Sequence, residues 1–384
     1  MRILLAFAVV LWAVLPALAR CPKDSGTAAF VAPGRFGVGV RSLTLVDTSR
    51  TTPAHGKLAE LPSRTLPTQV WYPTAPHTGA PTTDAPLARP GRFPVILNSH
   101  GYSDLNIGEA YLAEALASRG YVVASPLFPL TSLSTPSPRD PVDVINQPGD
   151  VKFVLDNVLT LAKTKGSWLA GGVDRHKIGA MGLSYGGLTT LLVTYHPTLR
   201  DPRIRASLPI APAACSLGPS FYRAARPPLL LLQGTADLVL PVADNAERAF
   251  ADSRSPRQLV ELKNATHTAF SGLIPETGPV LQYDEDLGCG VVVHDFDAAT
   301  QQRLMTLDDP ANGVDVSGCT APCAGPPPTT LPMSAARQHY LTKALVTAFF
   351  ESTFRRVHAA RCFLRGGLVR DLDLDVQTHP GGPS

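Results

Sequence analysis

Gly182-Leu183-Ser184-Tyr185-Gly186 reads Gly-x-Ser-x-Gly. The short apolar stretch 177–181 precedes it and the apolar segment 187–193 follows it, so a strand is expected to end there and a helix to begin. A serine in such a sharp turn adopts strained backbone angles, and the two glycines leave room for the neighbouring chain. The helix start supplies backbone N–H groups and a positive dipole end. The pattern indicates a nucleophilic Ser184, although an ordinary strand-to-helix turn is the alternative.

Two later strand ends carry residues that can activate such a serine. The apolar run 227–233 is typical of a buried parallel strand, and Asp237 follows its carboxyl end. The alternative for Asp237 is a loop aspartate that caps the next helix. His267 follows the short strand 258–262 in the same way, and its alternative is a histidine in a surface loop. The chain order Ser184, Asp237, His267 is the order of the catalytic triad in α/β-hydrolases and predicts such a triad.

These residues give the chain a family resemblance. It resembles the α/β-hydrolase superfamily, and within it the dienelactone-hydrolase-like branch that includes platelet-activating-factor acetylhydrolases, with bacterial cutinases and polyester hydrolases as relatives. The resemblance spans about residues 36–271 and the final helix. Its motifs are specific for the fold and for acyl chemistry and say little about the substrate. Besides the pentapeptide, Asp237 and His267, it is carried by residues 37–47, 69–73, 95–101 and 116–123.

The resemblance implies an activity and further site residues. It implies a serine hydrolase that cleaves carboxylic esters of short or medium acyl length through an acyl-enzyme intermediate, with no cofactor and no metal. The backbone N–H groups of Tyr102 and Tyr185 are the implied oxyanion-hole donors. His100 is expected to support the oxyanion loop by packing, the alternative being a second catalytic base. The rings of Tyr102 and Tyr185 either wall an acyl site or pack against the rim of the sheet.

Three alternatives to a simple esterase follow from the same residues. Polyester-hydrolase relatives typically carry Met after the serine and Trp just beyond the next strand, whereas this chain has Tyr185 and, in 211–216, no Trp. These departures weaken the alternative of a polyester or cutin-like hydrolase. Dienelactone hydrolases proper use a cysteine nucleophile, so Ser184 argues against that reaction. A non-catalytic binding module that retained the fold would be expected to have a broken triad.

Alternating strand and helix patterns predict the architecture. The expected fold is α/β, with a mostly parallel, doubly wound sheet and helices on both faces. Residues 36–47 and 65–72 are expected as opening antiparallel strands. Further strands are expected at 93–99, 121–126, 177–183, 206–211, 228–233 and 257–262, and helices at 108–119, 149–164 and 334–356.

The chain ends and the overall charge suggest where the protein acts. Residues 1–19 are predicted to be a signal peptide, because a short apolar run behind Arg2 ends in the small-x-small site 17–19. An uncleaved anchor is the alternative, and no other segment is long and apolar enough to span a membrane. Residues 20–370 are expected as one domain and 371–384 as a tail. A secreted or periplasmic location follows, and the net charge of +3 without a Lys/Arg cluster argues against nucleic-acid partners.

A cysteine-containing insertion, 272–333, precedes the last helix. About 60 residues without a regular pattern are either a lid at the active-site mouth or a decoration pinned by disulfides. An even number of cysteines in an exported chain indicates disulfides, and at least one bridge is expected to pin 289–323, with the pairing left open. The cysteines are Cys21, Cys215, Cys289, Cys319, Cys323 and Cys362. The acidic residues Asp284, Glu285, Asp286, Asp295 and Asp297 are expected to form a solvated face, with a calcium site as the alternative.

Overall fold

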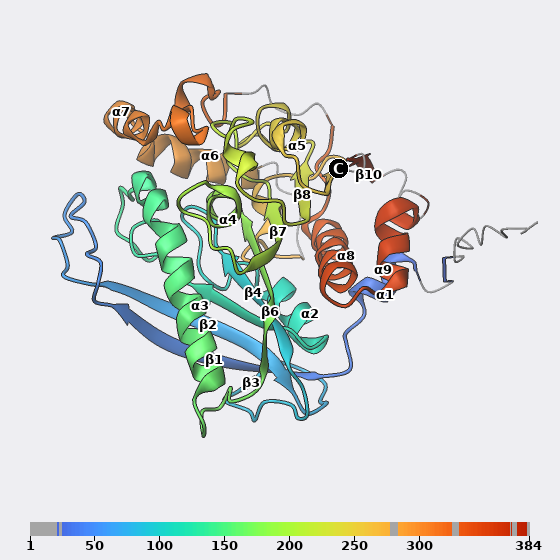
Figure 1. Cartoon of the computed structure of the whole chain (residues 1–384). Coiled ribbons are helices and arrows are strands. Elements are labelled where there is room, and N and C mark those ends of the chain that lie inside the picture. Colours follow the sequence, from blue (N-terminus) through green and yellow to red (C-terminus); the bar gives the residue numbers. More distant parts are fainter. Residues whose placement is uncertain are drawn as a thin grey trace, which may run out of the picture.

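The computed structural model describes residues 21–22, 25–276, 283–324, 330–368, 370 and 375–381. The predicted signal peptide lies outside these residues. Within them the strands form one sheet in the order β10-β9-β8-β7-β6-β4-β5-β2-β1-β3 (Figure 1). The strands are β1 Gly37–Asp47, β2 Arg64–Thr74, β3 Thr82–Thr83, β4 Phe93–Ser99, β5 Val122–Pro126, β6 Val173–Leu183, β7 Ile204–Ile210, β8 Leu229–Gly234, β9 Arg257–Leu262 and β10 Val376–Pro380.

The sheet is parallel in its middle and antiparallel towards its edges. The strands from β5 to β9 pair in parallel, which confirms the predicted doubly wound arrangement. β2 pairs antiparallel with both β1 and β5. Residues 376–380 were expected to belong to a tail, but they form β10 and pair antiparallel with β9. Their backbone groups therefore cover an edge of the sheet that would otherwise be unpaired.

Helices cover both faces of the sheet because its strands are apolar on both sides. Val95 and Leu97 of β4 pack with α3 on one face, whereas Ile96 packs with α2 and α8 on the other. β8 alternates in the same way, since Leu230 faces α8 and Leu231 lies in the cluster that contains α4 and α5. The helices are α1 Thr27–Val31, α2 Ala110–Ser118, α3 Gln147–Lys163, α4 Tyr185–Tyr195, α5 Arg248–Asp252, α6 Tyr283–Asp295, α7 Ala298–Leu304, α8 Ala335–Phe354 and α9 His358–Cys362.

A buried ion network joins β2 to the start of α3. Arg64 is fully buried and donates two hydrogen bonds to Asp143, at 3.0 and 2.8 Å, and two to Asp150, at 2.8 and 2.7 Å. Arg50 adds a bond of 2.7 Å to Asp150 and another of 2.7 Å to Asp47. Removal of Arg64 would leave the buried carboxylate of Asp143 without its guanidinium, and an unpaired buried charge is costly.

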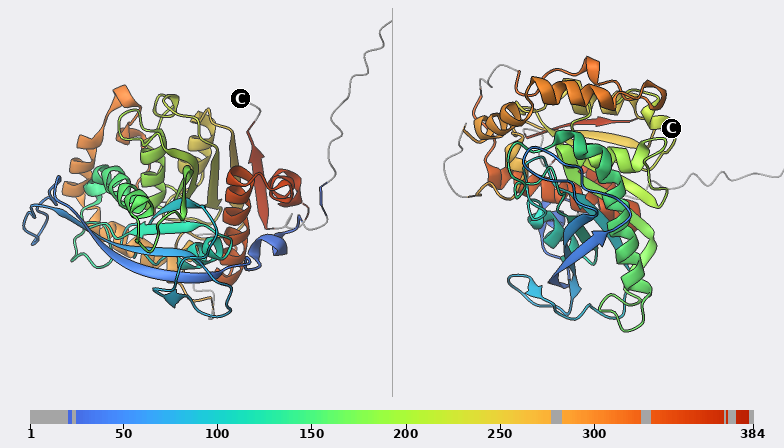
Figure 2. Two further views of the ribbon diagram at one scale, coloured as in Figure 1. Left: turned by 60° about the horizontal axis from the view of Figure 1, so that its bottom comes forward. Right: turned by 90° about the vertical axis from the view of Figure 1, so that its left-hand side faces the viewer.

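Residues 283–324, here called the cysteine-rich segment, are not structureless as the sequence suggested. They contain α6, α7 and several short 3₁₀ turns. In Figure 1 and the right-hand view of Figure 2 the segment (orange) lies at the end of the molecule away from β1 and β2. The expected pinning is confirmed, since disulfides join Cys215 to Cys319 and Cys289 to Cys323. A third disulfide joins Cys21 to Cys362.

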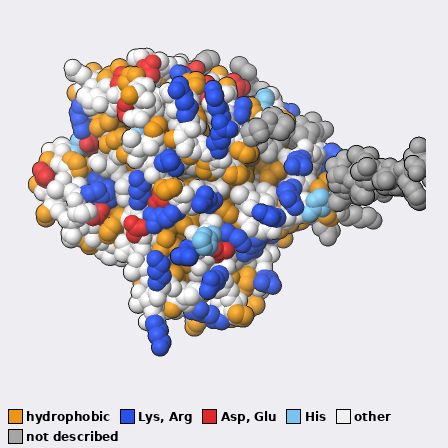
Figure 3. All heavy atoms as spheres, in the orientation of Figure 1, with side chains coloured by type: hydrophobic (Ala, Val, Ile, Leu, Met, Phe, Trp, Pro, Cys, Tyr) orange, Lys and Arg blue, Asp and Glu red, His pale blue; other side chains and the backbone are white. Residues whose placement is uncertain are grey.

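On the face of the molecule shown in Figure 3, Lys and Arg side chains are more plentiful than Asp and Glu side chains. Lys and Arg side chains are spread over this face from top to bottom, between apolar and neutral groups. Among the helices of the described residues, none has the length and apolar character needed to cross a membrane.

Candidate active site

Ser184 stands in the turn between β6 and α4. Its backbone angles, φ 58° and ψ −116°, lie in a strained region for a residue with a side chain. A Cβ atom on Gly182 would collide with the carbonyl of Gly186, and one on Gly186 would collide with the carbonyl of Ser99. The N–H of Ser184 donates to the Ile210 carbonyl at 2.8 Å, which ties the turn to β7. The tight strand-turn-helix geometry expected from the pentapeptide is therefore present, and both glycines are needed to form it.

Asp237 and His267 lie in contact after two neighbouring parallel strands. His267 follows β9, and its Nδ1 lies 2.7 Å from Oδ2 of Asp237, which follows β8. The Asp237 carboxylate also accepts from Gln233 Nε2 at 2.6 Å and from the Leu240 N–H at 2.7 Å. Both side chains are buried. Since β6, β8 and β9 run in parallel, their carboxyl ends bring these residues and Ser184 to the same edge of the sheet.

Glu285, from α6, joins the two loops that carry Asp237 and His267. It is 3% exposed. One carboxylate oxygen accepts from the Leu238 N–H at 2.9 Å, and the other accepts from the Thr268 N–H at 2.9 Å and the Thr268 hydroxyl at 3.1 Å. The expectation that Glu285 belongs to a solvated acidic face is therefore wrong, because backbone donors in the interior hold its carboxylate.

The charges around His267 favour its protonated form. Burial alone would lower the pKa of His267, but the charge and hydrogen bond of Asp237, together with the charge of Glu285, outweigh burial and raise it above the ordinary value. Burial and the neighbouring Asp237 in turn raise the pKa of Glu285. An imidazole in this setting can take a proton and keep it while a neighbouring reaction develops.

His100 supports the loop that carries Tyr102. It is almost fully buried, and its Nδ1 donates to the Gly101 carbonyl at 2.7 Å while its Nε2 accepts from the Phe128 N–H at 3.0 Å. Burial lowers the pKa of His100 to about 4, although the bond to Gly101 opposes this shift. Both ring nitrogens of the neutral His100 are thus engaged in hydrogen bonds to the backbone. This agrees with the expectation that His100 supports the oxyanion loop.

Asp295, at the end of α6, is a second buried acid of the cysteine-rich segment. It is 1% exposed and accepts from the Tyr102 hydroxyl at 3.1 Å, Ser137 at 2.9 Å, Arg139 at 3.1 Å and His294 at 2.8 Å. Burial alone would raise the pKa of Asp295, but these hydrogen bonds lower it. Asp295 therefore does not belong to a solvated face either, and it holds α6 against the loop before α3.

A cavity of about 760 Å³ opens beside Ser184. The rings of Tyr102 and Tyr185 line it and pack edge-to-face at 5.4 Å between centroids, and Phe296 of the cysteine-rich segment packs against both, at 5.2 and 5.9 Å. The two tyrosines thus both pack together and wall the cavity. Almost half of the lining residues come from the cysteine-rich segment. This segment is therefore close to the site as well as being pinned by disulfides.

A metal site is not found among the acidic side chains of the cysteine-rich segment that the structure describes, and the side chain of Asp284 lies outside them. In the described ranges, no group of three or more His, Cys, Asp or Glu side chains is arranged to hold a metal ion. Asp297 is exposed and caps α7 by accepting from the Thr300 N–H at 2.7 Å. The calcium alternative therefore gains no support from these residues.

Sequence reasoning missed three polar residues around the site. Gln233 is the last residue of the apolar run that predicted β8, and a single amide at the end of such a run was a possible signal. Glu285 and Asp295 carried no signal of their own, since their partners come from loops far away in the chain.

Known proteins share this architecture. A model of the PETase family, described as PET hydrolase-like, matches residues 69–276, which are more than half of the chain and include all five candidate site residues. Among solved structures, a ferulic acid esterase from Streptomyces cinnamoneus is similar in fold, with 23% sequence identity and a TM-score of 0.56 over 85% of this chain and 92% of that chain. Curated proteins offer no match of comparable significance. With its α/β-hydrolase fold and this match, the chain belongs to the PET hydrolase-like family.

Proposed function

We propose that this protein is a secreted serine hydrolase that cleaves carboxylic esters of short or medium acyl length, with Ser184, His267 and Asp237 as its catalytic triad. One observation carries the proposal. The buried Asp237–His267 pair and the strained turn of Ser184 lie at the same edge of the sheet. The family match and the similar esterase fold are consistent with an ester hydrolase.

In the proposed mechanism, Ser184 Oγ attacks the ester carbonyl carbon while His267 Nε2 takes its proton. The tetrahedral intermediate collapses, the alcohol leaves with the proton held by His267, and the acyl group stays on Ser184. Water then attacks the acyl-enzyme while His267 takes its proton, and collapse of the second tetrahedral intermediate releases the carboxylic acid and returns that proton to Ser184 Oγ. Asp237 keeps the proton on Nδ1 and stabilises the imidazolium, which is the role that its 2.7 Å contact supports.

The backbone N–H groups of Tyr102 and Tyr185 are the proposed donors to the oxyanion. Tyr185 is the first residue of α4, where a helix leaves N–H groups without an acceptor of its own. Each donor of this kind contributes about 3–4 kcal/mol to lowering the barrier in other enzymes. Because Tyr102 would act through its main chain, Tyr102→Phe should retain much of the activity.

Export remains part of the proposal. Three disulfides in one chain are typical of proteins that fold in an oxidising compartment. They are consistent with the signal peptide predicted for residues 1–19 and with a single mature domain. Mass spectrometry of the protein recovered from the culture medium would test this, since a mature chain that starts at Arg20 is expected.

The test of the triad is the turnover of a soluble nitrophenyl ester by Ser184→Ala. We expect kcat to fall by about 10⁶-fold, as when other catalytic serines are removed. Ser42→Ala, an exposed serine on β1, is the control and should retain full activity. If Ser184→Ala keeps wild-type turnover, the triad is wrong, and a non-catalytic binding module becomes the better interpretation.

Hydrolysis of a polyester is the second candidate, and the family match favours it. Release of soluble products from an insoluble polyester film, measured beside turnover of the soluble ester, separates the two. Tyr185 in the place where polyester-hydrolase relatives typically carry Met argues for the soluble ester.

A further inference from the structure

We infer that the cavity beside Ser184 binds the acyl chain of the substrate, and that this acyl group is a single flexible aliphatic chain belonging to a monomeric ester. The inference rests on the proposed function and goes beyond it by naming the substrate class. It follows from the chemistry of the cavity wall, from the side of Ser184 on which the cavity lies, and from the way the cysteine-rich segment covers it.

The floor of the cavity is an aliphatic stripe that begins at the nucleophile. Leu188 and Leu192 line the cavity and follow Ser184 by four and eight residues, so they lie on the same side of α4 one and two turns away. The buried Leu217 and Val144 continue the wall. Branched aliphatic side chains present no fixed polar partner, and they suit a chain of methylenes that can adapt to them.

The cover of the cavity is also mainly aliphatic. Val292 from α6, Leu304 from α7 and Val316 from the following turns all line it, all within the cysteine-rich segment. A cavity of about 760 Å³ has the size of sites that enclose a whole small molecule. Of the polar lining residues of this segment, Asp309 is half-buried and the others are exposed, so they mark an opening to solvent: Gln301, Thr306, Asp308, Ser317 and Thr320.

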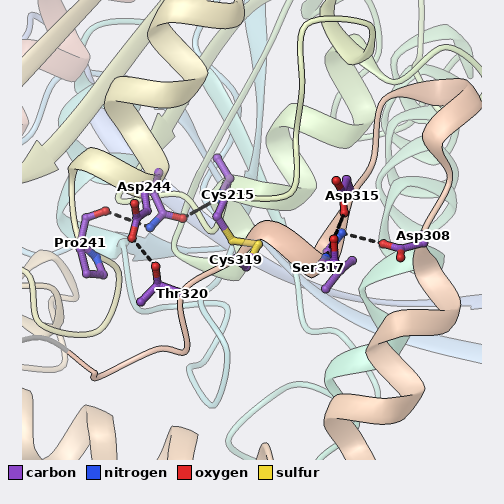
Figure 4. Close-up of a disulfide and its surroundings, with 11 residues drawn as sticks. Cys215, Pro241, Asp244, Asp308, Asp315, Ser317, Cys319 and Thr320 are labelled. Carbon is purple, nitrogen blue, oxygen red and sulfur yellow. Dashed lines mark hydrogen bonds between the residues drawn. A yellow bond between two sulfur atoms is a disulfide. The ribbon is translucent and has the colours of Figure 1, made fainter.

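Several separate links hold the cover over the cavity. Figure 4 shows the Cys215–Cys319 disulfide beside the hydrogen bond from Thr320 to Asp244, 2.6 Å long. Arg303 of α7 donates to Asp140 at 2.8 Å, on the loop before α3. A polymer chain continues on both sides of the bond that is cut and needs an open groove. A cover that is linked to the rest of the protein on two sides leaves room for a substrate acyl chain whose end lies inside the cavity.

The cavity lies on the acyl side of the reaction. Ser184 is among the described residues that line it, whereas His267 is not. In the proposed mechanism the alcohol departs with the proton of His267, so the leaving group lies towards the imidazole. The part of the ester that remains bonded to Ser184 is the part that the cavity beside Ser184 can hold.

The test compares nitrophenyl acetate, butyrate, hexanoate and octanoate with the full-length mature protein. Burial of each methylene is worth roughly fourfold in binding, so kcat/KM should rise at least about 100-fold from acetate to octanoate. Val292→Phe narrows the cavity and should lower the octanoate-to-acetate ratio of kcat/KM by about tenfold or more. Leu188→Phe narrows it from the floor and should act in the same direction.

Val293→Phe is the matched control, because Val293 is the next residue of α6 and is 65% exposed. It should leave the ratio unchanged. An octanoate-to-acetate ratio of kcat/KM near one in the wild type would overturn the acyl site. So would a fall of this ratio in Val293→Phe equal to that in Val292→Phe. In either case, turnover of the acetate ester would still support the proposed function. No turnover of any ester, with Ser184 inert to a fluorophosphonate, overturns the proposed function itself.

Discussion

The central sheet and the cysteine-rich segment reach the same cavity by different means. The sheet holds Ser184, Asp237 and His267 at the ends of buried apolar strands, packed between helices on both faces. The cysteine-rich segment has few buried apolar side chains. It is held instead by two disulfides and by the buried acids Glu285 and Asp295.

This difference in how the two regions are held suggests that they have different tasks, the sheet in the reaction and the segment in the choice of ester. Strand ends packed in a core fix the reacting groups, whereas a surface segment can change its lining without disturbing them. Glu285 is where the two regions meet, because from α6 it binds backbone N–H groups of the loops that carry Asp237 and His267. The account therefore predicts that changes in the sheet, or at Glu285, affect the chemistry with every ester, and that changes elsewhere in the segment affect mainly the choice of ester.

Among the variants that compare the two regions, Asp237→Asn in the sheet has the largest expected effect. The change keeps the size of the side chain but removes the negative charge that holds the imidazole, and in a comparable triad such a change lowers kcat by about 10⁴-fold. The loss should be similar for acetate and octanoate, as measured by kcat on both esters. A loss confined to octanoate would contradict the division between the two regions.

The next effect concerns stability. Arg64→Leu leaves the buried carboxylate of Asp143 without its guanidinium and leaves Asp150 with Arg50 alone, and it should lower the free energy of unfolding by about 3–5 kcal/mol. Lys177→Ala removes an exposed ion pair with Asp174 and should cost at most about 1 kcal/mol. Urea unfolding measures both. Equal effects would show that the Arg64 network does not stabilise the sheet as described.

Removal of the Cys289–Cys323 bridge tests the cysteine-rich segment. The bridge closes a loop between cysteines 34 residues apart, and in the chain-entropy model this is worth about 3–4 kcal/mol. In the double variant Cys289→Ser and Cys323→Ser, amide exchange in α6 should accelerate while β6 to β8 stay protected. The variant without the Cys21–Cys362 bridge should leave exchange in α6 unchanged. Faster exchange in the sheet instead would mean that the segment supports the fold as a whole.

Glu285→Gln should have the smallest effect and a distinctive pH dependence. His267 must be neutral to act as a base, so kcat/KM rises with pH through its pKa, which is raised in the wild type. Loss of the Glu285 charge lowers that pKa and should move the acid limb of the profile to lower pH. Asp286→Asn, an exposed neighbour on α6, is the control. If the acid limb of the kcat/KM profile does not move in Glu285→Gln, then Glu285 has a structural role only.

The sequence was a good guide wherever apolar patterns are long. Strands such as β4 and β9, and helices such as α8, lie within one or two residues of their predicted ranges. β10 was missed because Val376–Pro380 contains little apolar surface and ends in proline. α6 was missed because Gly288, Gly290 and three consecutive valines disfavour a helix, and here tertiary contacts outweigh that preference.

The candidate site could be predicted in part from the sequence, again because apolar strand patterns reveal where strands end. Ser184, Asp237 and His267 follow strands that the sequence reveals, so their place at one edge of the sheet could be anticipated. Burial of Glu285 and Asp295 depends on partners from distant loops, and an acid with such partners is indistinguishable in sequence from one that faces solvent.

The most direct test of the central claim is the labelling of the folded protein with a fluorophosphonate, followed by peptide mapping. The account predicts one label per molecule, on Ser184, and a rate of labelling that falls sharply in His267→Ala. Labelling of another residue, or equally fast labelling of Ser184 without His267, would contradict it.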